Sequence, residues 1–319
     1  MTVKKDSNHI AYPSQLAMFL GLAGGGLIIS ALASVLIWLM MEGAAMPHTA
    51  NDILQPKYYS VNMVIQVVST FFIFFLPTYF FALICYRHPQ KFIGFTTTIN
   101  YKQVLLVILI LIMTFPLAAG LGELNKIFPI PKDLAVRFRA MENAREAQEA
   151  AMIHIDSLSK YLISLLVIAL LPALFEETFF RGGMQNFLTR WFNSPLISIL
   201  VTSLIFSLIH LSYYGFLVRF GLGIILGYVF YLSGSLWLSA LFHFFFNGIQ
   251  VTALYIMTLY KSLPAKDFET HFPIWLALPA VLILFYLFHM YENISIQQKL
   301  LNPETATVED ELYDWTQRS

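Results

Sequence analysis

Three charged side chains interrupt an apolar stretch near the middle of the chain. Glu176, Glu177 and Arg181 lie in the segment ALFEETFFRGG, which directly follows the apolar run LISLLVIALLP. Glu177 and Arg181 are four residues apart, so a helix places them on one face in the order that favours an ion pair. Glu176 is rotated by about 100° from Glu177. Burial beside a second carboxylate suits the less paired glutamate, Glu176, to act as a general base.

Two later apolar segments carry further polar side chains. The first, FSLIHLSYYG, contains Phe206 and His210, and we predict that His210 lies within a membrane span. The second, ALFHFFFNGI, contains His243 and Asn247, which are four residues apart and share a helical face. Because lipid offers no hydrogen bonds, polar groups on separate membrane helices are best satisfied by one another. The sequence therefore predicts one shared polar cavity.

These residue types suit the hydrolysis of an amide by water. We expect Glu176 and His210 to activate the water, and His243 and Asn247 to donate hydrogen bonds to the developing oxyanion. Other hydrolase signatures are missing from the sequence: there is no G-x-S-x-G elbow and no H-E-x-x-H zinc helix, and Cys85 has no motif partner.

A metal-bound water is an alternative that the sequence leaves open. Glu176, His210 and His243 form a set of two histidines and one glutamate, which can hold zinc with an open fourth position. The pattern does not decide between this zinc site and a water activated by Glu and His alone.

The composition indicates which elements position these residues. Of the 319 residues, 58% are hydrophobic and only 12% are charged, whereas a soluble domain is typically about one quarter charged. The apolar runs are continuous and long enough for membrane helices. We predict an all-α fold, a polytopic transmembrane bundle of about eight spans in a lipid bilayer. The zero net charge and the lack of a basic run exclude nucleic acid as an expected partner.

Polar segments divide this bundle. The predicted units are a polar N-terminus (1–15), N-terminal membrane helices (16–122) and an extramembrane helical loop (123–159). They are followed by a core with the polar motifs (160–255), a last membrane helix with its preceding loop (256–291) and a polar tail (292–319). In the extramembrane loop, Glu142, Arg145, Glu146 and Glu149 fall at helical spacings, which predicts a solvated charged face.

The three motifs, in this order and on successive spans, resemble the CPBP family of intramembrane proteases. That family includes the type II CAAX prenyl endopeptidases and bacterial abortive-infection or bacteriocin-processing relatives, and its signature is EExxxR, FxxxH and HxxxN. The resemblance covers about residues 160–255. The residues that match the signature are Glu176, Glu177, Arg181, Phe206, His210, His243 and Asn247.

The resemblance implies a membrane-embedded endopeptidase, which we expect as a multi-pass protein of a bacterial plasma membrane. Its substrate would be a membrane-associated protein or peptide, with CAAX-type C-terminal processing as one candidate reaction. Glu176 and His210 would activate water, His243 and Asn247 would form the oxyanion hole, and Glu177 and Arg181 would hold the site. Zinc stays open as a cofactor. Gly223 and Gly227 form a small-xxx-small pair that predicts close helix packing.

Two other functions also fit buried Glu, Arg and His side chains. A proton-coupled transporter uses such groups in its ion pathway, although no duplicated half with broken helices is evident. A non-catalytic immunity or partner-binding protein is the other alternative. The complete set of motif residues favours the protease over both.

Overall fold

The described part of the chain is helical. The computed structural model describes residues 10–44, 50–53, 55–152, 155, 157–259 and 274–301, and every regular element within these residues is a helix. Most of the predicted polar N-terminus, much of the loop before the last helix and most of the polar tail lie outside the described residues. The prediction of an all-α fold is confirmed.

Seven helical stretches among the described residues are long and apolar enough to cross a membrane. One further apolar helix, α11 (Pro195–Ile209), is shorter. Together they agree with the prediction of about eight spans, and the chain is an integral, multi-pass membrane protein. The seven stretches are α1 (Tyr12–Glu42), α3 to α4 (Tyr59–Cys85), α6 (Tyr101–Ile127), α8 to α10 (Leu158–Phe192), α12 (Phe216–Ser233), α13 (Leu236–Leu259) and α14 (Ala277–Leu301).

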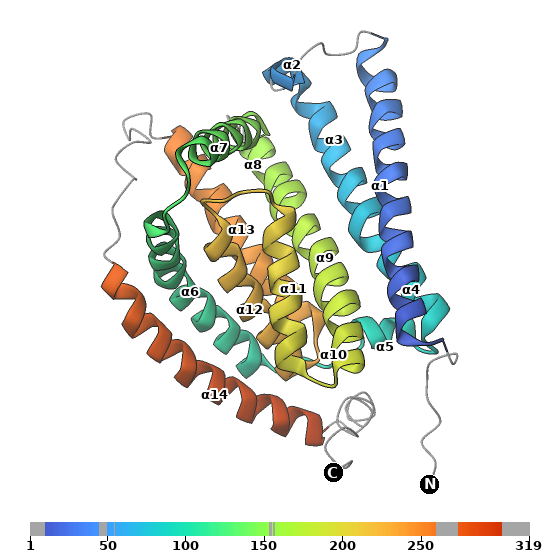
Figure 1. The fold of residues 1–319 in the computed structure, drawn as a ribbon, viewed down its shortest axis with the longest axis vertical. Helices are drawn as coiled ribbons and strands as arrows, with labels where there is room; N and C mark the ends of the chain where they lie inside the picture. Colours follow the sequence, from blue (N-terminus) through green and yellow to red (C-terminus); the bar gives the residue numbers. More distant parts are fainter. Residues whose placement is uncertain are drawn as a thin grey trace.

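The helices form three groups (Figure 1). On one side, α1 packs against α3 (Tyr59–Thr70) and α4 (Leu76–Cys85), and on the other side α14 packs against α6. Between them lie α11, α12 and α13 with the helices α8 (Leu158–Ser164), α9 (Leu171–Glu177) and α10 (Asn186–Phe192). The short helices α2 (Ala50–Ile53) and α5 (Pro89–Ile93) lie at opposite ends of the bundle. Residues far apart in sequence thus meet in the central group.

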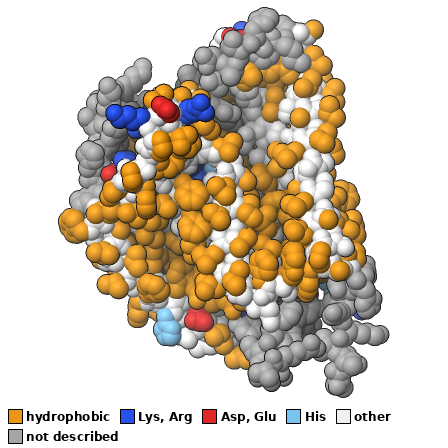
Figure 2. Space-filling model, in the orientation of Figure 1, with side chains coloured by type: hydrophobic (Ala, Val, Ile, Leu, Met, Phe, Trp, Pro, Cys, Tyr) orange, Lys and Arg blue, Asp and Glu red, His pale blue; other side chains and the backbone are white. Residues whose placement is uncertain are grey.

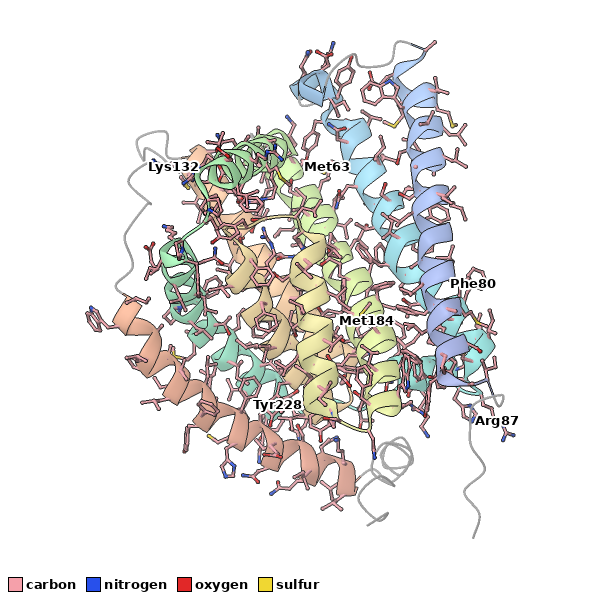
Figure 3. The ribbon with its side chains drawn as sticks, in the orientation of Figure 1. Met63, Phe80, Arg87, Lys132, Met184 and Tyr228 are labelled. Carbon is pink, nitrogen blue, oxygen red and sulfur yellow. The ribbon has the colours of Figure 1, made fainter. Side chains whose placement is uncertain are left out.

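The outer surface of this bundle is apolar along the helices (Figure 2). Leucines, isoleucines and phenylalanines stay exposed on α1 and α14, for example Leu32 at 62% and Phe285 at 72%. Charged side chains gather instead at the ends: Lys132 and Arg87 mark the two ends in Figure 3. This distribution is the one that a lipid environment requires, because apolar side chains face the hydrocarbon and charges reach water.

Two π-helical segments precede prolines. Phe71–Phe75 leads into Pro77, and Leu165–Leu170 leads into Pro172. A proline lacks the N–H that a regular helix uses, and its ring clashes with the carbonyl four residues earlier. In both cases that carbonyl lies within the π-helical segment, so the wider turn accommodates the proline without breaking the span. A third π-helical segment, Thr178–Gln185, follows Glu177.

The predicted close packing at Gly223 and Gly227 is confirmed. A Cβ built on Gly223 would lie 2.8 Å from Cβ of Ser203, and one built on Gly227 would lie 3.0 Å from Cγ2 of Ile199. Both neighbours belong to α11, so these glycines allow α12 to approach α11 closely. Gln185 Nε2 also donates a hydrogen bond to the Gly227 carbonyl (2.9 Å), which ties the third π-helical segment to α12.

The predicted extramembrane helix forms as α7 (Lys132–Met152), which lies across one end of the bundle (Figure 1). The prediction of a solvated charged face is wrong for Glu142, whose side chain is buried at 7% exposure, while Glu146 is exposed. The side chain of Glu149 lies outside the described residues. Glu142 is buried because this side of α7 packs against the turn between α11 and α12, a contact that helical spacing alone does not reveal.

Candidate active site

The first motif lies where α9 passes into the π-helical segment Thr178–Gln185. Glu177 and Arg181 are fully buried, whereas the Glu176 side chain keeps 15% of its surface exposed. Segments of π-helix occur frequently at functional sites, because the extra residue per turn redirects side chains that an α-helix would place elsewhere. Glu176 is therefore the accessible carboxylate of the pair.

Glu177 is held by two partners. Its Oε2 lies 3.1 Å from Nε of Arg181, so the predicted ion pair is confirmed. Its Oε1 accepts a hydrogen bond of 3.0 Å from Nδ1 of His243 on α13. The carboxylate thus neutralises the arginine and fixes the ring of the histidine, whose other nitrogen, Nε2, points away from Glu177.

The second nitrogen of His243 faces Glu176. His243 Nε2 and Glu176 Oε2 are 4.0 Å apart, which exceeds the length of a direct hydrogen bond. Two carboxylates therefore flank one imidazole: Glu177 binds Nδ1 and Glu176 lies opposite Nε2. This pairing of the two motifs across α9 and α13 could not be predicted from their sequence spacing.

We predicted that His210 lies within a membrane span. The structure instead places it directly after the last residue of α11. The helix ends at Ile209, and the next residue but one, Leu211, has a φ of +50°, which stops the helix. The Nδ1 of His210 contacts the carbonyl oxygen of Phe206 at 2.7 Å. A carbonyl can only accept, so Nδ1 carries the proton, and in the neutral imidazole Nε2 then presents a lone pair.

The ring of Phe206 contacts residues of all three motifs. It is 2% exposed and lies edge-on to His210 and His243, with ring centroids 4.9 Å and 6.1 Å apart. The Arg181 guanidinium lies 5.2 Å from the same ring, within the range of a cation–π contact. Phe206 thus separates the two histidines and supports the buried arginine.

The predicted site residues are not all in direct contact. Glu176, Glu177, Arg181 and His243 form one series of polar contacts. Asn247 is half-buried one turn beyond His243 on α13. Among the described residues, no hydrogen bond or ion pair joins His210 to Glu176 or Asn247, and His210 meets the cluster through Phe206.

A zinc site was one alternative from the sequence. In the described part of the chain, no group of three or more His, Cys, Asp or Glu side chains is arranged to hold a metal ion, and zinc at Glu176, His210 and His243 stays a prediction.

Two buried polar residues beside His210 were missed by sequence reasoning. Ser212 follows His210 closely and is buried at 5% exposure, and Glu142 of α7 binds its hydroxyl at 2.7 Å. A signal for Ser212 existed, since it lies two residues after a motif histidine. None existed for Glu142, which is 70 residues from its partner and sits among other charges.

A comparison with known proteins finds one protein family whose model matches a segment of the chain. No curated protein and no solved structure matches the chain. A family model described as type II CAAX prenyl endopeptidase Rce1-like matches residues 158–249, which begin with α8, end within α13 and include every predicted site residue. The resemblance seen in the three motifs is confirmed, and it supports a CAAX-type intramembrane endopeptidase in general. Residues 158–249 of this multi-pass membrane protein are therefore similar to the type II CAAX prenyl endopeptidases of the Rce1-like family.

Proposed function

We propose that the protein hydrolyses a peptide bond of a membrane-associated substrate with a water molecule activated by Glu176. The observation that carries this proposal is the polar series Arg181, Glu177, His243 and Glu176, buried between α9 and α13. Because the matched family is named for CAAX prenyl endopeptidases, a prenylated C-terminal peptide is the first substrate class to test.

The two histidines are suited to different tasks. His210 donates its Nδ1 proton to a neutral carbonyl, so its Nε2 can accept a hydrogen bond from the attacking water. His243 donates Nδ1–H to a carboxylate, which is placed to balance a positive charge on the ring, as the aspartate does in a serine protease triad. A protonated His243 can then donate from Nε2 to an oxyanion.

The charges of the cluster support this assignment. Glu176 and Glu177 carry two negative charges, and Arg181 supplies one positive charge. Arg181 offsets only one of these two charges, so a low-dielectric interior favours a second group that donates a hydrogen bond to the carboxylates, as His243 does to Glu177. The distance of 4.0 Å between Glu176 Oε2 and His243 Nε2 leaves these groups close enough to act on one tetrahedral centre from two sides.

The reaction then proceeds in two steps. Glu176 takes a proton from water as its oxygen bonds to the carbonyl carbon of the substrate, and His243 Nε2–H and the Asn247 amide donate to the resulting oxyanion. Glu176 next passes its proton to the amide nitrogen as the C–N bond breaks. The products are a new carboxyl terminus and a free amine, and Glu176 is again ionised.

The test is peptide cleavage by detergent-purified protein. Fluorogenic peptides that end in a farnesylated CAAX-type sequence and their unprenylated counterparts are incubated with the wild type, Glu176→Gln and the matched control Glu146→Gln, whose side chain is exposed on α7. Each is assayed with and without a chelator.

We expect the wild type and Glu146→Gln to cleave at equal rates and Glu176→Gln to be at least about 100-fold slower, since general-base catalysis typically contributes 10²–10⁴-fold. Equal cleavage by Glu176→Gln would overturn the assignment of the base. Loss of activity with chelator would overturn the metal-free mechanism. If no peptide is cleaved, the partner-binding alternative is favoured, and proton flux in liposomes that Glu176→Gln abolishes would favour a transporter.

A further inference from the structure

The helix α7 contacts the turn between α11 and α12 through a single side. The Phe138 ring stacks on the Tyr213 ring with 4.9 Å between centroids and an angle of 1°, and the Arg139 guanidinium lies 4.4 Å from the Tyr214 ring centre. Glu142 follows Phe138 by one helical turn and so lies on the same side. The extramembrane helix is thereby placed against the residues that directly follow His210.

Glu142 is bound into this contact by hydrogen bonds at both carboxylate oxygens. Its Oε2 accepts from the Ser212 hydroxyl at 2.7 Å, and its Oε1 accepts from Nε of Arg145 at 3.2 Å and also from Nη2 of Arg145. The Ser212 hydroxyl in turn accepts from the backbone N–H of Gly215 at 3.1 Å. Ser212 thus links a charged residue of α7 to the backbone of the turn.

The electrostatics keep Glu142 ionised. Burial on its own would raise the pKa of this carboxyl. Hydrogen bonds from Arg145 and Ser212, and the positive charges of Arg145 and Arg219, outweigh burial and hold the pKa below its usual value. An ionised carboxylate is a stronger acceptor than a neutral one, so the bond from the Ser212 hydroxyl is charge-assisted.

The turn between α11 and α12 is stabilised by contacts to other helices. Leu211, between His210 and Ser212, has a φ of +50°, a conformation that non-glycine residues adopt only when their surroundings enforce it. One support comes from α6, where the Asn125 side chain donates a hydrogen bond of 2.8 Å to the Tyr213 carbonyl. The other support comes from α7, where the hydrogen bond from Ser212 to Glu142 fixes the residue directly after Leu211.

We infer that Glu142 is a positioning residue for His210, which acts through the Ser212 hydroxyl and the turn His210–Gly215 to hold the imidazole in its working orientation. This inference rests on the proposed function for the catalytic use of His210. It assigns to the extramembrane helix α7 a part in the reaction, although none of its residues belongs to the three motifs. Glu142 does not touch the reacting atoms in this scheme.

The experiment combines kinetics with a direct view of the His210 ring. Glu142→Ala, Ser212→Ala, the double variant and the control Glu146→Ala are compared for kcat and KM on the best peptide substrate. The same proteins, labelled with ¹³C at histidine Cε1, are examined by NMR, with the His210 signal assigned through His210→Gln.

We expect Glu142→Ala and Ser212→Ala each to lower kcat roughly 10-fold to 100-fold with little change in KM, as for a misplaced catalytic group. The double variant should be no slower than the slower single variant, because both remove one linkage. The His210 signal should shift in all three and stay in place in Glu146→Ala.

The outcomes separate the positioning role from the proposed function. An unshifted His210 signal in Glu142→Ala would overturn the positioning role, whatever happens to kcat. Multiplicative effects in the double variant would also overturn it, since they indicate two independent roles. A shifted signal with unchanged kcat would support the positioning of His210 and refute its part in catalysis.

Discussion

Removal of Arg181 is a severe single change at the site, because it leaves a buried carboxylate without its cation. The guanidinium is fully buried, lies 3.1 Å from Glu177 and contacts the Phe206 ring. Its replacement by methionine keeps much of the volume but leaves Glu177 without its cation. Breaking a buried ion pair by removing one partner typically costs about 3–5 kcal/mol, because the remaining charge is uncompensated.

A second substitution tests the origin of that loss. In the double variant Arg181→Met with Glu177→Gln, no uncompensated charge remains, and the glutamine oxygen can still accept from His243 Nδ1. Replacing both members of a buried pair is often close to neutral. We therefore expect the double variant to recover more than half of the stability lost in Arg181→Met.

The assay is equilibrium unfolding in mixed micelles, followed by tryptophan fluorescence as the fraction of denaturing detergent rises. Arg137→Met, at an exposed position on α7, serves as the matched control and should change the unfolding free energy by less than about 0.5 kcal/mol. A double variant as unstable as Arg181→Met would refute the charge argument and would point to lost packing against Phe206 instead.

Three further predictions follow from packing and charge. In Gly227→Ala the new methyl would meet Ile199 on α11, and this overpacking should lower the unfolding free energy by about 1–3 kcal/mol. In the control Gly21→Ala the methyl would have no atom within 4 Å, so stability should not change. Thermal unfolding of the two variants compares them directly. Phe206→Ala should lower the unfolding free energy by about 3–5 kcal/mol, as for other buried phenylalanines, and stability equal to wild type would contradict its central packing. Because the pKa of Glu142 is lowered in the folded protein, its contribution to stability is present above the pKa of the unfolded carboxyl and is lost as the pH falls through the lower, folded value. Denaturation measured from pH 7 down to pH 3 should therefore show a smaller loss of stability on acidification for Glu142→Gln than for the wild type.

Local properties of the chain were predictable from the sequence. Hydropathy places the spans because each helix must satisfy its own backbone and present apolar side chains to lipid, which requires no knowledge of the neighbours. The ion pair of Glu177 with Arg181 was predictable for the same reason, since four-residue spacing on one helix brings the two side chains together. The close approach at Gly223 and Gly227 also follows from residue size alone.

Contacts between distant segments were decided only by the tertiary structure. The motif order indicated that the polar groups share a site, but the packing of α9 against α13 determines that His243, and not His210, lies between the two glutamates. The end of α11 at Ile209 depends on a left-handed residue that hydropathy does not detect.

Glu142 is the clearest case of this difference. By itself, the sequence of α7 describes a polar helix with charges at helical spacing, and such a helix is expected to be solvated. Its burial depends on the turn that follows His210, 70 residues further along the chain, and on the hydroxyl that this turn presents. The sequence alone therefore determined the spans, the motifs and the ion pair within α9 and its π-helical extension, because those interactions are local. The tertiary structure alone decided which helix covers the site and which carboxylate faces which histidine, because those contacts depend on how separate helices pack.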